Sequence, residues 1–349
     1  MEKKKTRDSN IELLRIIAMF LILVVHASFR TLDVPTSSDI DSDLWSAFLR
    51  CFSESFSIIS VNLFVLISGW FGINANFKRL CSLIFQIYFI GIFMYVFLRL
   101  FGNLEAMNLR DIKEFLLLKE HWFIKSYIVL FIFAPILNAF IKHSTRQQIK
   151  LFLIIFFTIQ TIHGYTPITD SKWFSDGYSP LSFMGLYILA RYMYLYPNKW
   201  TQFNKYTDLL IFLAITISTS ILTLLNIKRT GMGWTYYAYS SPFVIINTIY
   251  FFLFFTKFSF KNKIINWISI SSFAVYIVHC SFNFFDTFFS NYIKEWFETK
   301  TSISFMLYTT GWLVLVFFFS ILLDKIRILV WNIVLIITNK KPQHKNTTR

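Results

Sequence analysis

Long apolar runs recur along the whole chain and decide what it can fold into. Of the 349 residues, 55% are hydrophobic and only 15% are charged, whereas charged residues make up about 25% of an ordinary soluble domain. Boundaries placed at the runs give ten candidate membrane spans, at residues 10–29, 56–72, 80–101, 121–141, 149–163, 181–196, 207–226, 241–257, 264–288 and 302–324. The sequence therefore predicts an all-α, polytopic transmembrane helix bundle of about ten spans.

The charge distribution predicts how this bundle lies in the membrane. With these ten spans, 21 of the 34 Lys and Arg residues, but only five of the 19 Asp and Glu residues, fall on the side of the N-terminus. Cytoplasmic segments of membrane proteins carry such an excess of Lys and Arg. We expect both termini to be cytoplasmic, with basic tails at residues 1–9 and 325–349 on either side of a single integral-membrane domain. Topology then accounts for most of the net charge of +15, and no nucleic-acid partner is expected.

Two ionisable residues inside the first span are the leading functional candidates, because such groups are costly within a bilayer. Arg15 and His26 are eleven residues apart, about 1100° of helix, so they share one face and lie about 16 Å apart along the axis. His26 suits a general base or a nucleophile, and Arg15 suits phosphate binding. Purely structural roles remain open: Glu12 is spaced to pair with Arg15, and His26 could make a polar helix contact.

Four further residues are candidates for the outer, acceptor-binding side. His121 and Lys125 lie one helical turn apart, and His279 falls in the outer half of the ninth span, in SSFAVYIVHCSF. Trp173 lies in an outer loop with Asp and Lys, a combination that suits stacking on a sugar ring. The structural alternatives are snorkelling for Lys125, the interfacial aromatic belt for Trp173 and helix packing for His279.

Lys78 and Arg79, in a short basic connection on the cytoplasmic side, are candidates for binding the phosphates of a donor. Their alternative role is to hold topology and contact anionic lipid. The three cysteines, Cys51, Cys81 and Cys280, show no CxxC or metal-binding spacing and are interpreted as packing residues. We therefore expect no metal site and no permanently bound cofactor.

At Arg15 and His26, within NIELLRIIAMFLILVVHASF, the chain resembles the acyltransferase 3 family of bacterial membrane acyltransferases. The first span of that family carries a basic residue, ten intervening residues and a histidine. Further similar segments are VNLFVLISGWF, HWFIKSYIVLFIFAPILN, LARYMYLY and SSFAVYIVHCSF, so the resemblance covers almost the whole chain. The family's Arg-x-x-Arg motif is not reproduced in NFKRLCSL, where Lys78 and Arg79 stand in its place.

The resemblance implies a ten-helix enzyme of the bacterial cytoplasmic membrane. It would move an acyl group, usually acetyl, from cytoplasmic acyl-CoA to a hydroxyl of a cell-surface polysaccharide or lipid-linked saccharide. His26 would act as base or transient acyl carrier, and Arg15 would help to hold the acyl-CoA. Two other functions stay open, a lipid-linked oligosaccharide exporter and a glycan polymerase. An exporter often shows repeat symmetry and charges in several spans, and a polymerase would need a large outer loop.

Overall fold

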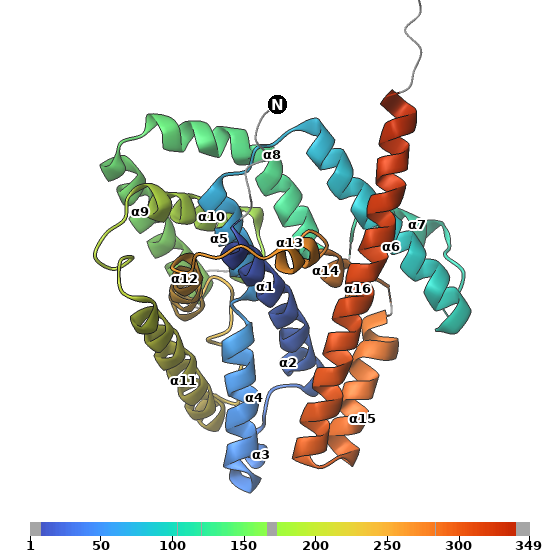
Figure 1. Cartoon of the computed structure of the whole chain (residues 1–349). Coiled ribbons are helices and arrows are strands. Elements are labelled where there is room, and N and C mark those ends of the chain that lie inside the picture. Colours follow the sequence, from blue (N-terminus) through green and yellow to red (C-terminus); the bar gives the residue numbers. More distant parts are fainter. Residues whose placement is uncertain (1–7, 103, 120, 166–172, 283, 340–349) are drawn as a thin grey trace, which may run out of the picture.

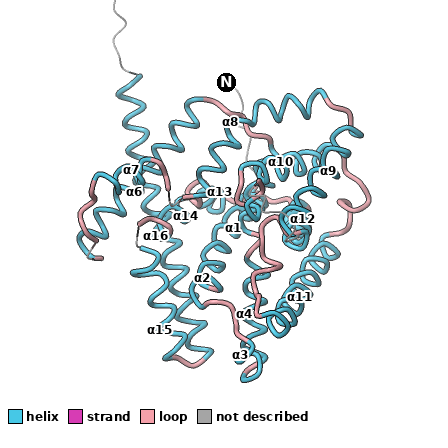
Figure 2. Tube along the Cα trace, turned by 180° about the vertical axis from the view of Figure 1, so that it is seen from behind, coloured by secondary structure: helices cyan, strands magenta, loops and turns pink. Residues whose placement is uncertain are grey.

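A computed structural model describes residues 8–102, 104–119, 121–165, 173–282 and 284–339, and within them every regular element is a helix (Figures 1 and 2). Residues 1–7 and 340–349 of the predicted basic tails lie outside these ranges. In chain order the elements are α1 Ser9–Ala27, α2 Phe29–Leu32, α3 Ser37–Ser42, α4 Leu44–Ser57, α5 Ser60–Phe71, α6 Phe77–Phe101, α7 Leu109–Leu116, α8 Trp122–His143, α9 Arg146–Tyr165, η1 Ser175–Gly177, α10 Pro180–Leu195, α11 Lys205–Thr230, α12 Pro242–Thr256, α13 Lys263–Ser269, α14 Ala274–His279, η2 Phe285–Ser290, α15 Asn291–Thr299 and α16 Ser302–Asn339.

Five helical segments of the described chain are long and apolar enough to cross a membrane, judged by length and composition. They are Ser9–Leu32, Leu44–Phe71, α6, α8 and α11. This finding supports the predicted membrane bundle, while the number of ten spans stays a prediction. The start of α1 and the end of α16 lie toward the same end of the bundle (Figure 1), as an even number of spans requires. The side of the membrane on which they lie also stays a prediction.

Glycines allow the close helix packing at the centre of the bundle. Gly69 of α5 lies directly against the backbone of Tyr187 and the side chain of Ala190 in α10, and a Cβ at this position would clash with both. Gly185, on the same helix α10, lies against the ring of Phe156. Small residues at helix crossings let two backbones approach closely, which is the usual device of membrane helix pairs. Helix packing therefore accounts for these two glycines.

The second predicted span is longer than expected. Helix α4 begins at Leu44, twelve residues before the expected start at residue 56, and continues through a turn at Ile58 and Ile59 into α5. The side chain of Asp43 accepts a hydrogen bond from the backbone N–H of Ser46 at 3.0 Å and caps the helix. The sequence prediction missed this helix because its first turns are mixed in polarity rather than apolar.

The ninth predicted span, residues 264–288, is not one continuous helix. It is divided into α13, the short α14 and the π-helical η2, with Phe282 in the left-handed region at φ 48°. Non-helical backbone at membrane depth is tolerated where it is buried in protein or lines a cavity. The break places His279 at the end of α14, where it can face another helix.

The last helix, α16, continues to Asn339, beyond the end expected at residue 324. Arg327 makes a bidentate, buried ion pair with Asp324, with N···O distances of 2.9 and 3.0 Å. Gln86 of α6 also donates to Asp324, at 2.8 Å. The two charges neutralise each other inside the bundle. The helix can therefore continue past residue 324, where the sequence predicted that a solvated tail begins.

Candidate active site

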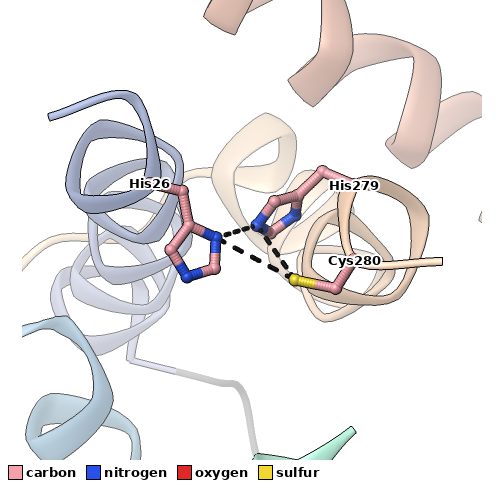
Figure 3. Close-up of side chains that lie close together, drawn as sticks. All are labelled: His26, His279 and Cys280. Atoms are coloured by element: carbon pink, nitrogen blue, oxygen red, sulfur yellow. Dashed lines mark hydrogen bonds between the residues drawn. The ribbon is translucent and has the colours of Figure 1, made fainter. Parts of the chain in front are cut away.

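The two intramembrane histidines predicted separately from the sequence lie in direct contact. His26, in the last turn of α1, and His279, at the end of α14, are joined by a hydrogen bond of 2.7 Å between Nδ1 of His26 and Nε2 of His279 (Figure 3). The Nδ1 atom of His279 lies 2.5 Å from the carbonyl oxygen of Val275. His279 is fully buried, whereas His26 is half-buried. The fold thus brings together residues 253 positions apart in the chain.

These contacts define the tautomers of the two neutral rings. A carbonyl oxygen only accepts, so Nδ1 of His279 must donate to Val275 and its Nε2 must accept. His26 then donates from Nδ1, which leaves its Nε2 unprotonated. Arg30 supports this assignment independently, because its guanidinium only donates and its Nη1 lies 3.3 Å from Nε2 of His26. The result is an oriented base whose second nitrogen is anchored through His279, the arrangement typical of catalytic histidines.

A break between α1 and α2 positions Arg30. Ser28 leaves the helical conformation with φ −86° and ψ −118°, and the next helix, α2, carries Arg30 four residues beyond His26. A side-chain oxygen of the buried Glu54 accepts a hydrogen bond from the backbone N–H of Phe29 at 3.3 Å. Phe285 of η2 lies under the guanidinium of Arg30, whose central carbon is 4.1 Å from the ring centroid. Arg30 is thereby held beside His26 although it is exposed.

A cavity of about 340 Å³ opens beside His26. Both aromatic rings and charged groups line this cavity. The lining residues are His26, Arg30, Trp122, Tyr276, Cys280, Phe282, Phe285 and Asp286. Such a mixture of apolar walls and a few convergent polar groups is typical of small-molecule sites. The ring of His26 therefore borders a space that a substrate can enter.

The residues expected to bind a donor lie elsewhere in the bundle. Arg15 donates to Glu12 at 2.6 Å, so the ion pair considered from the sequence is formed, and the Arg15 side chain remains 27% exposed. Arg79, in the first turn of α6, donates to the carbonyl of Asn74 at 2.9 Å, and Lys78 is exposed. The chain just before α6 lines a second cavity of about 670 Å³, together with the basic residues Arg191 and Lys142.

Three of the four acceptor-side candidates lie apart from the histidine pair. His121 is buried against Tyr276, with ring centroids 5.9 Å apart, and lines a different cavity. Lys125 donates to the carbonyl of Lys119 at 3.1 Å. Trp173 is exposed and stacks on His163, with centroids 5.9 Å apart. Only His279 joins His26 directly.

Several lining residues were not singled out from the sequence. The spacing of Arg30, four positions after His26, could have indicated it, because residues so spaced lie close together on a continuous helix, although the helix breaks at Ser28. Trp122 follows His121 directly, and Cys280 follows His279. Asp286 carried no signal in the sequence, because its place in the cavity depends on the broken ninth segment.

A comparison with known proteins identifies the family of the chain. Residues 8–325, nearly the whole chain, match the acyltransferase domain that defines the acyltransferase 3 family. No curated protein and no solved structure matches the chain. The sequence match covers both Arg15 and His26 as well as the segment that carries His279. The chain therefore belongs to the acyltransferase 3 family, and it is a membrane acyltransferase.

Proposed function

We propose that the protein is an O-acyltransferase that moves an acyl group, most simply acetyl, from cytoplasmic acyl-CoA to a hydroxyl of a cell-surface polysaccharide or lipid-linked saccharide. The observation that carries the proposal is the unprotonated Nε2 of His26, whose ring is oriented through His279 and lines a cavity together with Arg30. The protein is proposed to work in the cytoplasmic membrane of a bacterium, with both termini cytoplasmic.

In the proposed reaction His26 acts as a general base. Its Nε2 takes the proton of the acceptor hydroxyl while the hydroxyl oxygen attacks the thioester carbonyl. The tetrahedral intermediate collapses, the carbon–sulfur bond breaks, and the CoA sulfur takes the proton back from His26. During the step His26 is cationic, and its Nδ1–H hydrogen bond to His279 stabilises that charge. The guanidinium of Arg30, 3.3 Å from Nε2, lies where it can stabilise the developing oxyanion.

The acceptor would enter the cavity beside His26. Trp122 and Tyr276 line it with aromatic surface, and Asp286 provides a carboxylate that accepts hydrogen bonds from hydroxyls. Flat aromatic faces with a few hydrogen-bonding groups suit a saccharide better than a wholly apolar substrate. His121, Lys125 and Trp173 remain proposed for a more distant part of the acceptor, because none of them lines this cavity.

The donor would bind through basic residues. A CoA molecule carries several phosphate oxygens, which Lys and Arg neutralise, and Arg can contact phosphate with two parallel hydrogen bonds. Arg15, Lys78 and Arg79 remain the proposed contacts, and Arg191 adds a further cation in the cavity next to α6. No specific feature of the described residues favours the exporter or the polymerase over acyl transfer.

Membrane vesicles given radiolabelled acetyl-CoA test this function. Transfer predicts label in the extracted glycan or glycolipid fraction that mild base releases as acetate, since an O-acetyl ester is base-labile. Vesicles with His26→Ala should lose the label, while those with His143→Ala should keep it, because His143 is exposed at the far end of α8. Equal labelling by the wild type and the His26→Ala variant would contradict the proposal.

A further inference from the structure

Three atoms of the kind that bind transition metals converge next to the proposed base. Nδ1 of His26, Nε2 of His279 and Sγ of Cys280 all lie within 4.8 Å of one another. The sulfur is 3.4 Å from Nε2 of His279 and 3.9 Å from Nδ1 of His26, and the two nitrogens are 2.7 Å apart. The side chains point toward one another (Figure 3).

These separations are close to those of a tetrahedral zinc site. Zn–N bonds of about 2.05 Å and a Zn–S bond of about 2.3 Å place two nitrogens roughly 3.3 Å apart, and a nitrogen and a sulfur roughly 3.6 Å apart. The two N···S separations bracket that value. The nitrogens need to move apart by only about 0.6 Å, which rotation of one imidazole ring can provide.

The surroundings also suit a metal ion. The second nitrogen of His279 donates to the carbonyl of Val275, and metal-binding histidines are usually held by such a hydrogen bond. His26 and Cys280 are half-buried and line the same cavity, so an ion can reach them and keep a fourth position open. Asp286 supplies a negative charge to the wall of that cavity. Nitrogen ligands with a soft thiolate favour zinc over magnesium or calcium.

We propose that His26, His279 and Cys280 bind Zn²⁺ and that the bound ion inhibits acyl transfer. On binding, the thiol of Cys280 releases its proton, and the proton on Nδ1 of His26 moves to Nε2, so that the metal takes Nδ1. The exposed guanidinium of Arg30, which now lies beside Nε2 as a donor, must turn away from it, because two donors cannot pair. The Nε2 atom then carries a hydrogen and cannot accept one from a hydroxyl. The metal-bound state and the base-competent state therefore exclude each other. The inhibition rests on the proposed function, whereas the metal binding stands without it.

Cobalt(II) tests the binding independently of enzyme activity. The full-length protein, purified without a polyhistidine tag into lipid nanodiscs, is titrated with CoCl₂. A thiolate ligand gives a near-ultraviolet sulfur-to-cobalt charge-transfer band, and we expect one equivalent of Co²⁺ to produce it and Zn²⁺ to remove it. Cys280→Ser should abolish the band and weaken zinc binding at least about tenfold, while the control Cys81→Ser should keep both.

A second measurement needs no variant. Zn²⁺ should protect Cys280, but not Cys81, of the wild-type protein from alkylation, as read by peptide mass spectrometry. In the transfer assay, Zn²⁺ should inhibit the wild type, and a chelator should restore its rate. The absence of a cobalt band in the wild type, an unchanged band in Cys280→Ser, or alkylation of Cys280 unaffected by Zn²⁺ would each overturn the site. A wild-type enzyme that binds the ion and keeps its full rate would overturn the inhibition alone.

Discussion

Replacing His279 tests whether the second histidine works through the first. Nε2 of His279 accepts the Nδ1–H of His26 at 2.7 Å in a buried setting, and the bond strengthens when His26 becomes cationic during transfer. A hydrogen bond to a charged group contributes about 1.5–3 kcal/mol, which corresponds to roughly a 10- to 150-fold lower kcat when the bond is lost. Because His279 touches neither donor nor acceptor in the proposed mechanism, the KM for acyl-CoA should change little.

Two variants of His279 separate this positioning role from simple damage to the fold. The amide oxygen of Gln lies near the position of Nε2 in His, so His279→Gln keeps an acceptor for His26. The shorter side chain of His279→Asn reaches only the position of Nδ1. We expect His279→Gln to retain much of the wild-type kcat and His279→Asn to show the full loss, in nanodiscs with release of CoA thiol as the readout. Equal kcat values for the two variants, with equal melting temperatures, would refute the relay through His279.

Three further predictions concern the donor side, the helix packing and a surface cap. Arg15→Ala removes the ion pair between Arg15 and the buried Glu12 carboxylate, which should lower stability by about 1–3 kcal/mol. In the double variant with Glu12→Gln the melting temperature should recover, while the KM for acyl-CoA should stay above that of the wild type. Gly69→Leu forces a side chain into the backbone of α10 and should lower the melting temperature and the yield of folded protein, whereas Gly311→Leu, with nothing within 4 Å of its added Cβ, should be tolerated. Asp39, in the first turn of α3, accepts a hydrogen bond from the backbone N–H of Thr36 at 2.8 Å and so caps this helix; this hydrogen bond lowers the pKa of Asp39. Its contribution of roughly 1 kcal/mol should be complete above about pH 4, near the unfolded-state pKa, and be lost as the pH falls through the lower folded-state pKa. The melting temperatures of the wild type and Asp39→Ala should therefore converge at low pH, and a difference that stays constant would argue against the cap.

The sequence indicated the separate parts of the site but not how they meet. His26 and His279 each stood out as ionisable groups inside apolar segments, because burial of such groups is costly enough to be informative on its own. Their pairing depends on contacts between α1 and α14, which are far apart in the chain and leave no periodic signal. The cluster of His26, His279 and Cys280 could not be predicted for the same reason, since Cys280 has no metal-binding spacing to a neighbouring ligand in the sequence.

Some helix boundaries could be predicted from the sequence and others could not. Apolar periodicity located α6, α8 and α11 well, because these helices owe their positions to long hydrophobic stretches. It failed at the ninth segment, where local backbone breaks at positions such as Phe282 are stabilised by tertiary packing rather than by residue type. The last helix also continues beyond the predicted end at residue 324, because the charged residues there, which are also typical of a solvated tail, form a buried ion pair within α16.

The most direct test of acyl transfer is the NMR spectrum of the surface polysaccharide from cells that carry the wild-type protein, the His26→Ala variant or no copy. General-base catalysis contributes roughly 10²–10⁴-fold to a rate, so removing His26 should bring O-acyl signals close to those of cells without the protein. We predict that both defective strains lose these signals while the length of the polysaccharide chains is unchanged. Unchanged acylation together with shortened or missing polysaccharide would contradict acyl transfer and favour export or polymerisation.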